Sequence, residues 1–339
     1  MSALSLQFDC GGVWLPQLRL WLDPHERQAG PERVFVSHAH SDHTAAHREV
    51  ILSEPTARLM QARSVRVKIA HALGFGETRR FEDAAVPWQI TLWPAGHIFG
   101  SAMAFVEAGG ESLLYTGDFK LRPGLSAEPC APCHADVLVM ETTYGRPEYR
   151  FPPTDAVLRE VVRFCRETLE RGETAVLLGY SLGKSQELLC ALADAGLPIM
   201  LHDSVHKLTQ VYERLGRRFP AYERFDATNA ARKVLLCPPQ SARSTAVRNL
   251  GPVRVAIFTG WAVERSCRFR YGADAAFPLS DHADFPDLIE LVKRVAPRKV
   301  YTLHGFAADF ARTLRGLGYD AQSLSENEQL ELALGGAPP

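Results

Sequence analysis

The stretch "VFVSHAHSDHT" (residues 34–44) places three histidines and one aspartate within six positions, directly after an apolar run. Charged imidazoles so close together would repel one another, whereas neutral histidines and an ionised aspartate are compatible around a cation. Alternate residues leaving a strand point to opposite sides, so His38 and His40 form one candidate ligand pair, and Asp42 and His43 form another. The segment therefore predicts a metal site whose other ligands come from elsewhere in the chain.

The composition is that of an ordinary globular protein. The chain has 339 residues, 46% hydrophobic and 23% charged, with a formal net charge of −1. This length predicts two domains, or one domain with a large insertion. Any affinity for nucleic-acid phosphates would have to come from local patches, because there is no overall basic field. We find no basic and apolar leader and no apolar run of membrane-spanning length, so we expect a cytoplasmic protein without a membrane partner.

The pattern of predicted secondary structure changes near residue 150. Up to about residue 145, short strand-like runs alternate with turn signals, and Gly109-Gly110 predicts a hairpin turn. From about residue 152, strands alternate with amphipathic helices, which predicts an open, largely parallel sheet. The first such helix is expected to begin with Thr154 or Asp155 as its N-cap and to end at Gly172.

Three further candidate ligands follow strand-like runs. They are His97 in "WPAGHIFGSA" (93–102), Asp118 in "LLYTGDF" (113–119) and His304 in "KVYTLHGF" (299–306). A lone histidine or aspartate at a strand end is more often a structural residue, but the dense histidine segment favours a metal site. Zinc prefers histidine nitrogen and carboxylate oxygen, and paired metals often share a bridging carboxylate.

These motifs, in chain order, resemble those of the metallo-β-lactamase superfamily. The matching segments are "LQFDCGG" (6–12) with Asp9, "SHAHSDH" (37–43), "AGHIFGSA" (95–102) and "YTGDF" (115–119). Three later segments resemble motifs added by the β-CASP nucleases: "METTYG" (140–145) with Glu141, "LSDHADF" (279–285) with His282, and "LHGF" (303–306) with His304. The resemblance spans residues 9 to 305.

The resemblance implies an α/β fold, in which an αββα metallo-β-lactamase sandwich carries an inserted α/β β-CASP cap. It places the first part of the sandwich domain at 1–146, the cap at 147–272 and the return segment at 273–339. It also implies two divalent metal ions. Zinc fits the ligand types best, and manganese is also possible because mixed carboxylate and histidine sites accept it.

The family's roles carry over to matching positions of this chain. His38, His40 and His97 would hold the first metal, Asp42, His43 and His304 the second, and Asp118 would bridge both. Asp42 also counts among the expected catalytic residues. The two cations would activate the water that attacks phosphorus.

Three acidic or basic groups would assist. His282 would protonate the leaving oxygen, with Glu141 orienting its ring and raising its pKa. Asp9 would steady the ligands. A structural His282 that caps the following helix is the alternative interpretation.

The motifs give mixed signals about the substrate. A histidine at position 304 is typical of RNA-processing members, whereas "GYSLGKSQEL" (179–188) and "FTGW" (258–261) resemble the DNA-repair branch. The combination most resembles the bacterial ligase-associated DNA exonucleases, which are linked with an ATP-dependent DNA ligase and a helicase. We therefore predict a DNA exonuclease of DNA repair that acts on single strands or duplex ends. An RNA-processing nuclease and a non-catalytic scaffold that binds DNA or ligase remain alternatives.

Candidate nucleic-acid contacts lie in two segments. "GYSLGKS" (179–185) has three residues between its glycines where a P-loop needs four, so we interpret Lys184 as a phosphate contact rather than a nucleotide-binding lysine. A basic run at 57–80 contains Arg63, Arg66 and Lys68, which could track a nucleic-acid strand. A solvated helix face is the plainer interpretation of this run.

Overall fold

The computed structural model describes residues 5–324 and 328–331. The chain forms two compact units. The first comprises the chain up to Pro123, Glu128–Arg146 and the part from Phe285 onward, and the second comprises Gly124–Ala127 and Pro147–Asp284. The domain boundaries predicted from the sequence stay a prediction, and each unit is described below by itself.

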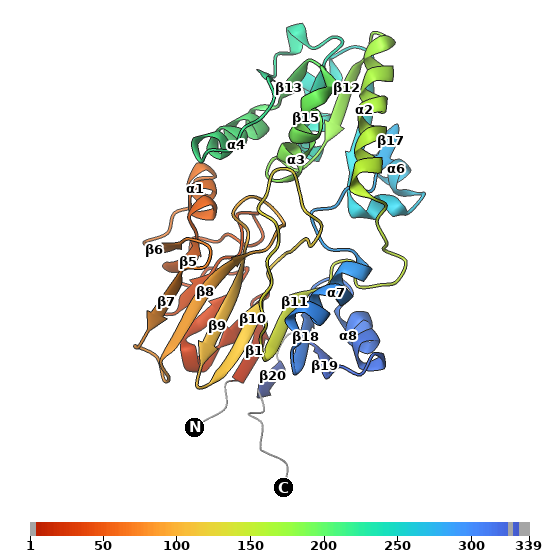
Figure 1. The fold of residues 1–339 in the computed structure, drawn as a ribbon. Coiled ribbons are helices and arrows are strands. Elements are labelled where there is room, and N and C mark those ends of the chain that lie inside the picture. The colour runs from red at the N-terminus through yellow and green to blue at the C-terminus, as the bar shows by residue number, and fades with distance from the viewer. Residues whose placement is uncertain (1–4, 325–327, 332–339) are drawn as a thin grey trace. The chain divides into compact units, whose positions relative to one another are not determined.

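The first unit contains two mixed seven-stranded sheets (Figure 1). Sheet A has the strand order β20 (Glu328–Glu331), β1 (Ser5–Asp9), β2 (Gly12–Leu15), β3 (Leu20–Leu22), β4 (Arg33–Phe35), β5 (Glu49–Ser53) and β6 (Ile69–Leu73). Sheet B has the order β19 (Ala321–Ser323), β18 (Lys299–Leu303), β11 (Val137–Glu141), β10 (Glu111–Tyr115), β9 (Ala102–Ala108), β8 (Trp88–Pro94) and β7 (Thr78–Phe81). The predicted Gly109-Gly110 turn joins antiparallel β9 and β10.

Side chains from the inner faces of both sheets form one apolar core. Leu22 and Phe35 of sheet A are fully buried in it, together with Ile90 and Tyr301 of sheet B. Helix α1 (Glu54–Ala62) contacts β5 and β6, and α8 (Ala307–Gly316) contacts β18 and β19. Helix α7 (Phe285–Val295) lies beside α8 in Figure 1. The expected αββα sandwich is confirmed.

The second unit is built on a six-stranded sheet whose neighbouring strands are all parallel. Its order is β14 (Glu223–Arg224), β13 (Ile199–Leu201), β15 (Val234–Cys237), β12 (Thr174–Leu178), β16 (Val253–Phe258) and β17 (Ala275–Phe277). Its helices are α2 (Thr154–Glu170), α3 (Lys184–Ala191), α4 (Asp203–Arg214), α5 (Thr245–Arg248) and α6 (Cys267–Arg270). The inserted, largely parallel α/β region is therefore present as predicted.

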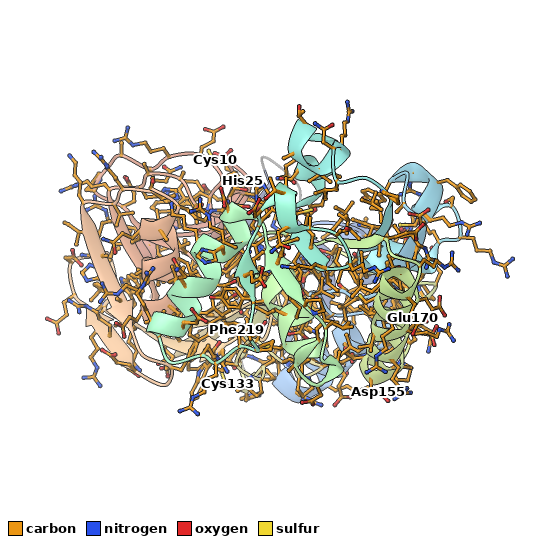
Figure 2. All side chains as sticks on the ribbon, turned by 90° about the horizontal axis from the view of Figure 1, so that it is seen from above. Cys10, His25, Cys133, Asp155, Glu170 and Phe219 are labelled. Atoms are coloured by element: carbon orange, nitrogen blue, oxygen red, sulfur yellow. The ribbon has the colours of Figure 1, made fainter. Side chains whose placement is uncertain are left out.

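Helix α2 follows its sequence pattern except at its start. Val157, Val161 and Cys165 are buried on one stripe, and the left-handed Gly172 (φ +81°) follows the C-cap. The N-cap is Pro153, without a side-chain cap, so the predicted Thr154 or Asp155 cap was wrong. The Asp155 carboxylate instead accepts a hydrogen bond from Arg159 one turn later. Asp155 and Glu170, the second and the last residue of the helix, are labelled in Figure 2.

Short 3-10 turns connect several elements, at Pro16–Leu18, Ala193–Ala195, Ala227–Asn229, Pro239–Arg243 and Gly260–Val263. None of the helices in the described residues is long and apolar enough to cross a membrane.

Candidate metal centre

The histidine-rich segment leaves the carboxyl end of β4, where its first residues are locked by buried partners. Ser37 and His38 are both fully buried. The Ser37 amide donates to Asp23 Oδ1 at 2.7 Å, and the Ser37 hydroxyl lies 2.9 Å from His38 Nδ1. Because Nδ1 of His38 is engaged by the hydroxyl, its Nε2 is the ring nitrogen that faces the other histidines.

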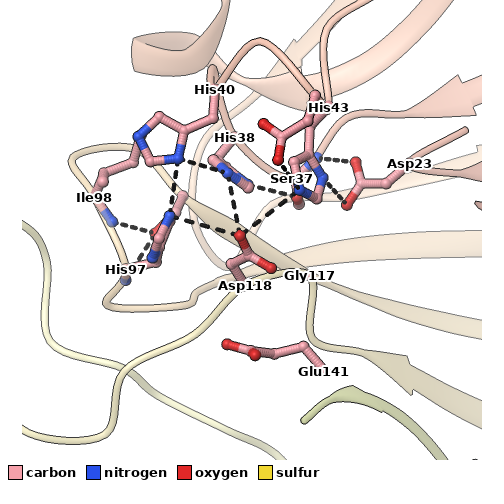
Figure 3. A network of polar contacts seen from close by, with 12 residues as sticks. Asp23, Ser37, His38, His40, His43, His97, Ile98, Gly117, Asp118 and Glu141 are labelled. Carbon is pink, nitrogen blue, oxygen red and sulfur yellow. Dashed lines mark hydrogen bonds and ion pairs between the residues drawn. The ribbon is translucent and has the colours of Figure 1, made fainter. Parts of the chain in front are cut away.

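Four side chains bring one donor atom each to a common centre (Figure 3). Nδ1 of His40 lies 3.1 Å from Nε2 of both His38 and His97. Oδ2 of Asp118 lies 3.6 Å from Nε2 of His38 and 3.8 Å from Nε2 of His97. The four donor atoms all lie within 4.8 Å of one another.

This donor set fits a metal ion. Ligand atoms about 2.0–2.1 Å from a tetrahedral zinc lie about 3.4 Å apart, and the observed separations of 3.1 to 3.8 Å bracket that value. Neutral imidazole nitrogens turned toward one another in a buried place direct their lone pairs at the same point. A cation at that point would satisfy all three histidines and neutralise Asp118.

Two glycines allow the loops to approach this closely. Gly117 (φ +53°) precedes Asp118, and a Cβ there would lie 2.5 Å from the Ser37 side chain. Gly96 (φ +77°) precedes His97, and a Cβ there would lie 2.3 Å from the Lys120 carbonyl oxygen. Both positions combine a left-handed backbone with a lack of space, so only glycine fits.

The ligands predicted for a second metal are held less closely. His43 Nε2 lies 3.6 Å from Asp118 Oδ2 and 3.9 Å from Asp42 Oδ2. Asp42, however, is 67% exposed. Burial would lower the pKa of His43, but the carboxylates of Asp23 and Asp118 outweigh burial and raise it to about 10.

His304 approaches the same region from the end of β18. Its backbone is left-handed (φ +58°), and its carbonyl oxygen accepts a hydrogen bond from the Thr142 hydroxyl at 2.7 Å. Burial, and then the neighbouring His43, lower the pKa of His304 to about 4. Its ring is therefore neutral at pH 7 and able to act as a ligand, although it is not part of the four-donor set.

The supporting carboxylate is Asp23 rather than the expected Asp9. Asp9 is exposed at the end of β1, where its Oδ1 accepts a hydrogen bond from the Cys10 amide. Asp23 is fully buried, and its Oδ2 lies 3.2 Å from Nδ1 of His43 while its Oδ1 accepts from the Ser37 amide. The signal for Asp23 was present in "LWLDPH" (20–25), an acid directly after an apolar strand.

His25 is a second residue that the sequence reasoning missed. Its ring is parallel to that of His304 at 5.9 Å and lies 6.0 Å from the ring of His43. Its amide donates to the Cys10 carbonyl, and Figure 2 labels Cys10 and His25 close together. A Cβ at Gly11 would lie 2.5 Å from the His25 ring, so the β1–β2 turn packs directly on it.

The predicted acid and its orienting carboxylate occupy different units. Glu141 is buried in the first unit, where its two carboxylate oxygens accept from the amides of Phe119 (3.3 Å) and Thr143 (3.0 Å). His282 lies in the second unit, is partly exposed, and donates its amide to Ser280 Oγ at 2.9 Å. Their pairing stays a prediction.

The candidate nucleic-acid contacts separate into two groups. Lys184 is only 3% exposed, and its Nζ donates to Asp281 Oδ1 and to the Leu279 carbonyl, so the expected phosphate contact is not supported. Arg63 is half-buried and donates to the Ala39 carbonyl of the histidine-rich segment at 3.0 Å. Arg66 and Lys68 are exposed and stay predictions.

Two family models match the chain. The metallo-beta-lactamase superfamily model matches residues 8–166, and a model described as a Zn-dependent metallo-hydrolase RNA specificity domain matches residues 275–323. These ranges include every segment predicted to supply a metal ligand.

Several named proteins are similar in sequence. A "Probable DNA ligase" of Opitutus terrae is 54% identical over 329 residues, which cover 97% of this chain but only 32% of that protein. The "5' exonuclease Apollo" of Gallus gallus is 27% identical, covering 88% of this chain and 64% of that one. A "Probable RNase MJ4" of Methanocaldococcus jannaschii is 24% identical, covering 81% of each.

A solved structure shares the fold. A protein of unknown function from Enterococcus faecalis V583 superposes with a TM-score of 0.61 at 13% identity, covering 88% of this chain and 81% of that one.

Proposed function

Because this chain belongs to the metallo-β-lactamase superfamily, in its β-CASP nuclease group, we propose that it is a DNA exonuclease of DNA repair that uses two divalent metal ions. The observation that carries the proposal is the convergence of His38, His40, His97 and Asp118 on one point. Three imidazole nitrogens and a carboxylate face one another here. A bound cation accounts for this arrangement better than hydrogen bonds among the four groups do.

The proposed ligand sets are those expected from the motifs. His38, His40 and His97 would hold one metal, Asp42, His43 and His304 the other, and Asp118 would belong to both. Bound divalent metals, zinc by ligand preference, would supply charge for the phosphate and an activated water. Asp23 would orient His43, since its carboxylate lies on the far side of that ring from Asp118.

The remaining chemistry is proton transfer to the leaving group. A phosphodiester releases a poor alkoxide, so a positioned acid accelerates the reaction, typically by about 10²–10⁴-fold. We assign this role to His282. Glu141 would orient His282, and the two amides that hold its carboxylate would prevent it from rotating away.

The choice of DNA and of a ligase partner rests on the relatives. The chain matches nearly its whole length to about a third of a protein named as a probable DNA ligase. A nuclease segment that forms part of such a polypeptide could trim ends that a ligase then joins. The exonuclease named for Gallus gallus supports the same reaction. An ATP-dependent DNA ligase is therefore the proposed partner, and the family resemblance adds a helicase.

A specific observation keeps RNA as the second candidate. The model that matches residues 275–323 is described as an RNA specificity domain, and one relative is named as a probable ribonuclease. His304, within that range, is the residue that the motif analysis associated with RNA-processing members.

The test compares both substrates directly. Purified protein would be incubated with end-labelled single-stranded DNA and RNA of one sequence, with zinc or manganese. We expect DNA products that shorten from one end and that disappear with Asp42→Ala and His282→Ala. Preferential cleavage of RNA would replace the DNA proposal, and metal-loaded protein that cleaves neither would refute a nuclease.

A further inference from the structure

The segment that carries His282 belongs to neither a strand nor a helix. Residues 279–284 lie between β17 and α7 without regular secondary structure. Within this stretch, Leu279, Ser280 and Asp281 are buried on one side of His282, and Ala283 and Asp284 are buried on the other. His282 alone among the six is partly exposed. Its position therefore depends on what holds its neighbours.

Side chains hold the segment on both sides of the histidine. Lys184 Nζ donates to the Leu279 carbonyl and to Asp281 Oδ1, both at 2.7 Å. Asp284 Oδ2 accepts from the Phe151 amide at 2.8 Å. Of these two side chains, Lys184 donates hydrogen bonds both to a backbone carbonyl and to a carboxylate within three residues of His282.

The turn before α3 leaves room for the buried side chain of Lys184. Lys184 is the first residue of α3, after Gly183 (φ +87°). A Cβ at Gly179 would lie 2.9 Å from Lys184 Cγ, so the glycine leaves room for the lysine stem. The glycines that gave "GYSLGKS" its likeness to a P-loop thus direct the ammonium into the protein interior.

A buried lysine paired with an aspartate contributes little net stability to a fold. Removing an ammonium and a carboxylate from water is unfavourable, and apolar side chains of similar volume are often at least as stabilising. Such a pair can instead specify one conformation of the chain, because an ion pair with two hydrogen bonds is directional and apolar packing is not. Here the arrangement that it fixes is the backbone directly before His282.

We propose that Lys184 is a positioning residue for His282. The inference rests on the proposed role of His282 as the acid that protonates the leaving oxygen. Lys184 would act by holding 279–281, and through it the imidazole, in the place from which the proton is delivered. Loss of this anchor would impair proton delivery while leaving the metal ligands in the first unit untouched.

A substrate that needs no acid separates this role from general support of the fold. The leaving group of thymidine 5′-(4-nitrophenyl) phosphate is a stabilised phenolate that departs without a proton, unlike the alkoxide of DNA. The variants are Lys184→Met, which keeps the stem and removes the charge, and His282→Ala. Lys207→Met, an exposed lysine of α4, is the matched control. Metal content and thermal unfolding would be measured for each.

We expect Lys184→Met to slow DNA hydrolysis about 100-fold, the scale of a misplaced catalytic group, and to leave aryl-ester hydrolysis within about threefold of wild type. His282→Ala should show the same selective loss, and Lys207→Met no loss. If Lys184→Met does not fold, Lys184→Met with Asp281→Asn removes both buried charges and should show the same selectivity.

Two results would overturn the inference, and they differ. Selective loss in His282→Ala but equal or no loss on the two substrates in the Lys184 variants would reject the positioning role alone. Equal loss on both substrates in His282→Ala would reject His282 as the acid, and with it both the proposed mechanism and this inference.

Discussion

The two halves of the candidate metal centre differ in how firmly the protein holds their ligands. The first half consists of His38, His40 and His97 with Asp118, whose donor atoms already lie at the spacing a metal requires. The second half depends on Asp42, which is 67% exposed, and on His304, whose own backbone is left-handed (φ +58°). His43 is buried like His38 and His97, whereas His40 and His304 are both partly exposed.

This difference teaches that one superficially uniform motif can produce two unequal sites. A preformed, buried donor set binds a metal without first ordering side chains, whereas an exposed carboxylate must lose rotamer freedom. We therefore expect the first metal to bind more tightly than the second. The shared carboxylate of Asp118 should be the single residue on which both depend.

The largest effect is expected from Asp118→Ala. Its Oδ2 contacts His38, His43 and His97, so its loss leaves both halves without their common anion. Loss of the metals' charge stabilisation, worth several kcal/mol, should lower cleavage about a thousandfold or more. Metal analysis should find fewer than one ion per chain. Asp194→Ala, an exposed aspartate of the second unit, is the control. Normal metal content in Asp118→Ala would contradict the bridging assignment.

Single histidine variants sharpen the comparison between the halves. His304→Ala should leave about one tightly bound metal per chain, because the four-donor set is intact. His97→Ala removes a member of that set and should reduce the tight site itself. Calorimetric titration of the metal-free chain with zinc would measure the metal affinity of both variants. Equal loss of the tight site in the two variants would show that the halves are not independent.

A smaller effect distinguishes the two acids that could support the ligands. Asp23→Asn should weaken metal binding about 10–100-fold, the usual effect of removing a partner of a ligand histidine. The reason is that Asp23 contacts both His43 and the Ser37 amide. Asp9→Asn should leave metal affinity unchanged, since the Asp9 carboxylate is exposed. The opposite ranking would restore Asp9 to the position that the sequence motif suggested.

Residues whose chemistry is local were predictable from the sequence. His38, His40, His97 and Asp118 each stand at a strand end in a distinctive segment, and the structure brings them together. The parallel sheet of the second unit was likewise visible in the alternation of strands and helices. Such signals are visible because periodicity and turn residues act over a few positions.

Residues whose role depends on a distant partner were not predictable. Lys184 follows a glycine-rich turn as a phosphate-binding lysine would, but its partner Asp281 lies almost a hundred positions away, and no local pattern announces that contact. Asp9 ends β1 and Asp23 directly follows β3, and only the places of these two strands in sheet A determine which of the two aspartates is buried. Position in the sheet decided between two equivalent local signals.

The last predicted effect is on the stability of the fold rather than on metal binding, and it concerns a buried histidine next to the second half of the centre. His47 is buried four residues after His43, and its Nδ1 accepts a hydrogen bond from the Gln28 amide at 3.1 Å. Burial lowers the pKa of His47 from 6.5 to about 4, although Asp23 opposes this shift. The unfolded chain therefore takes up a proton below about pH 6.5 that the folded chain refuses until about pH 4, so stability should fall across that window.

His47→Gln should remove this dependence, because a glutamine can accept from the Gln28 amide and does not titrate. Between pH 7 and pH 4.5, the metal-free wild type should lose about 2–3 kcal/mol more of its free energy of unfolding than the variant, because folding lowers the pKa of His47 from 6.5 to about 4. Urea unfolding in the presence of a chelator would measure both proteins at each pH. Parallel losses in the two proteins would mean that His47 accepts a proton in the fold, and that the segment carrying Asp42 and His43 is not supported by a neutral buried histidine.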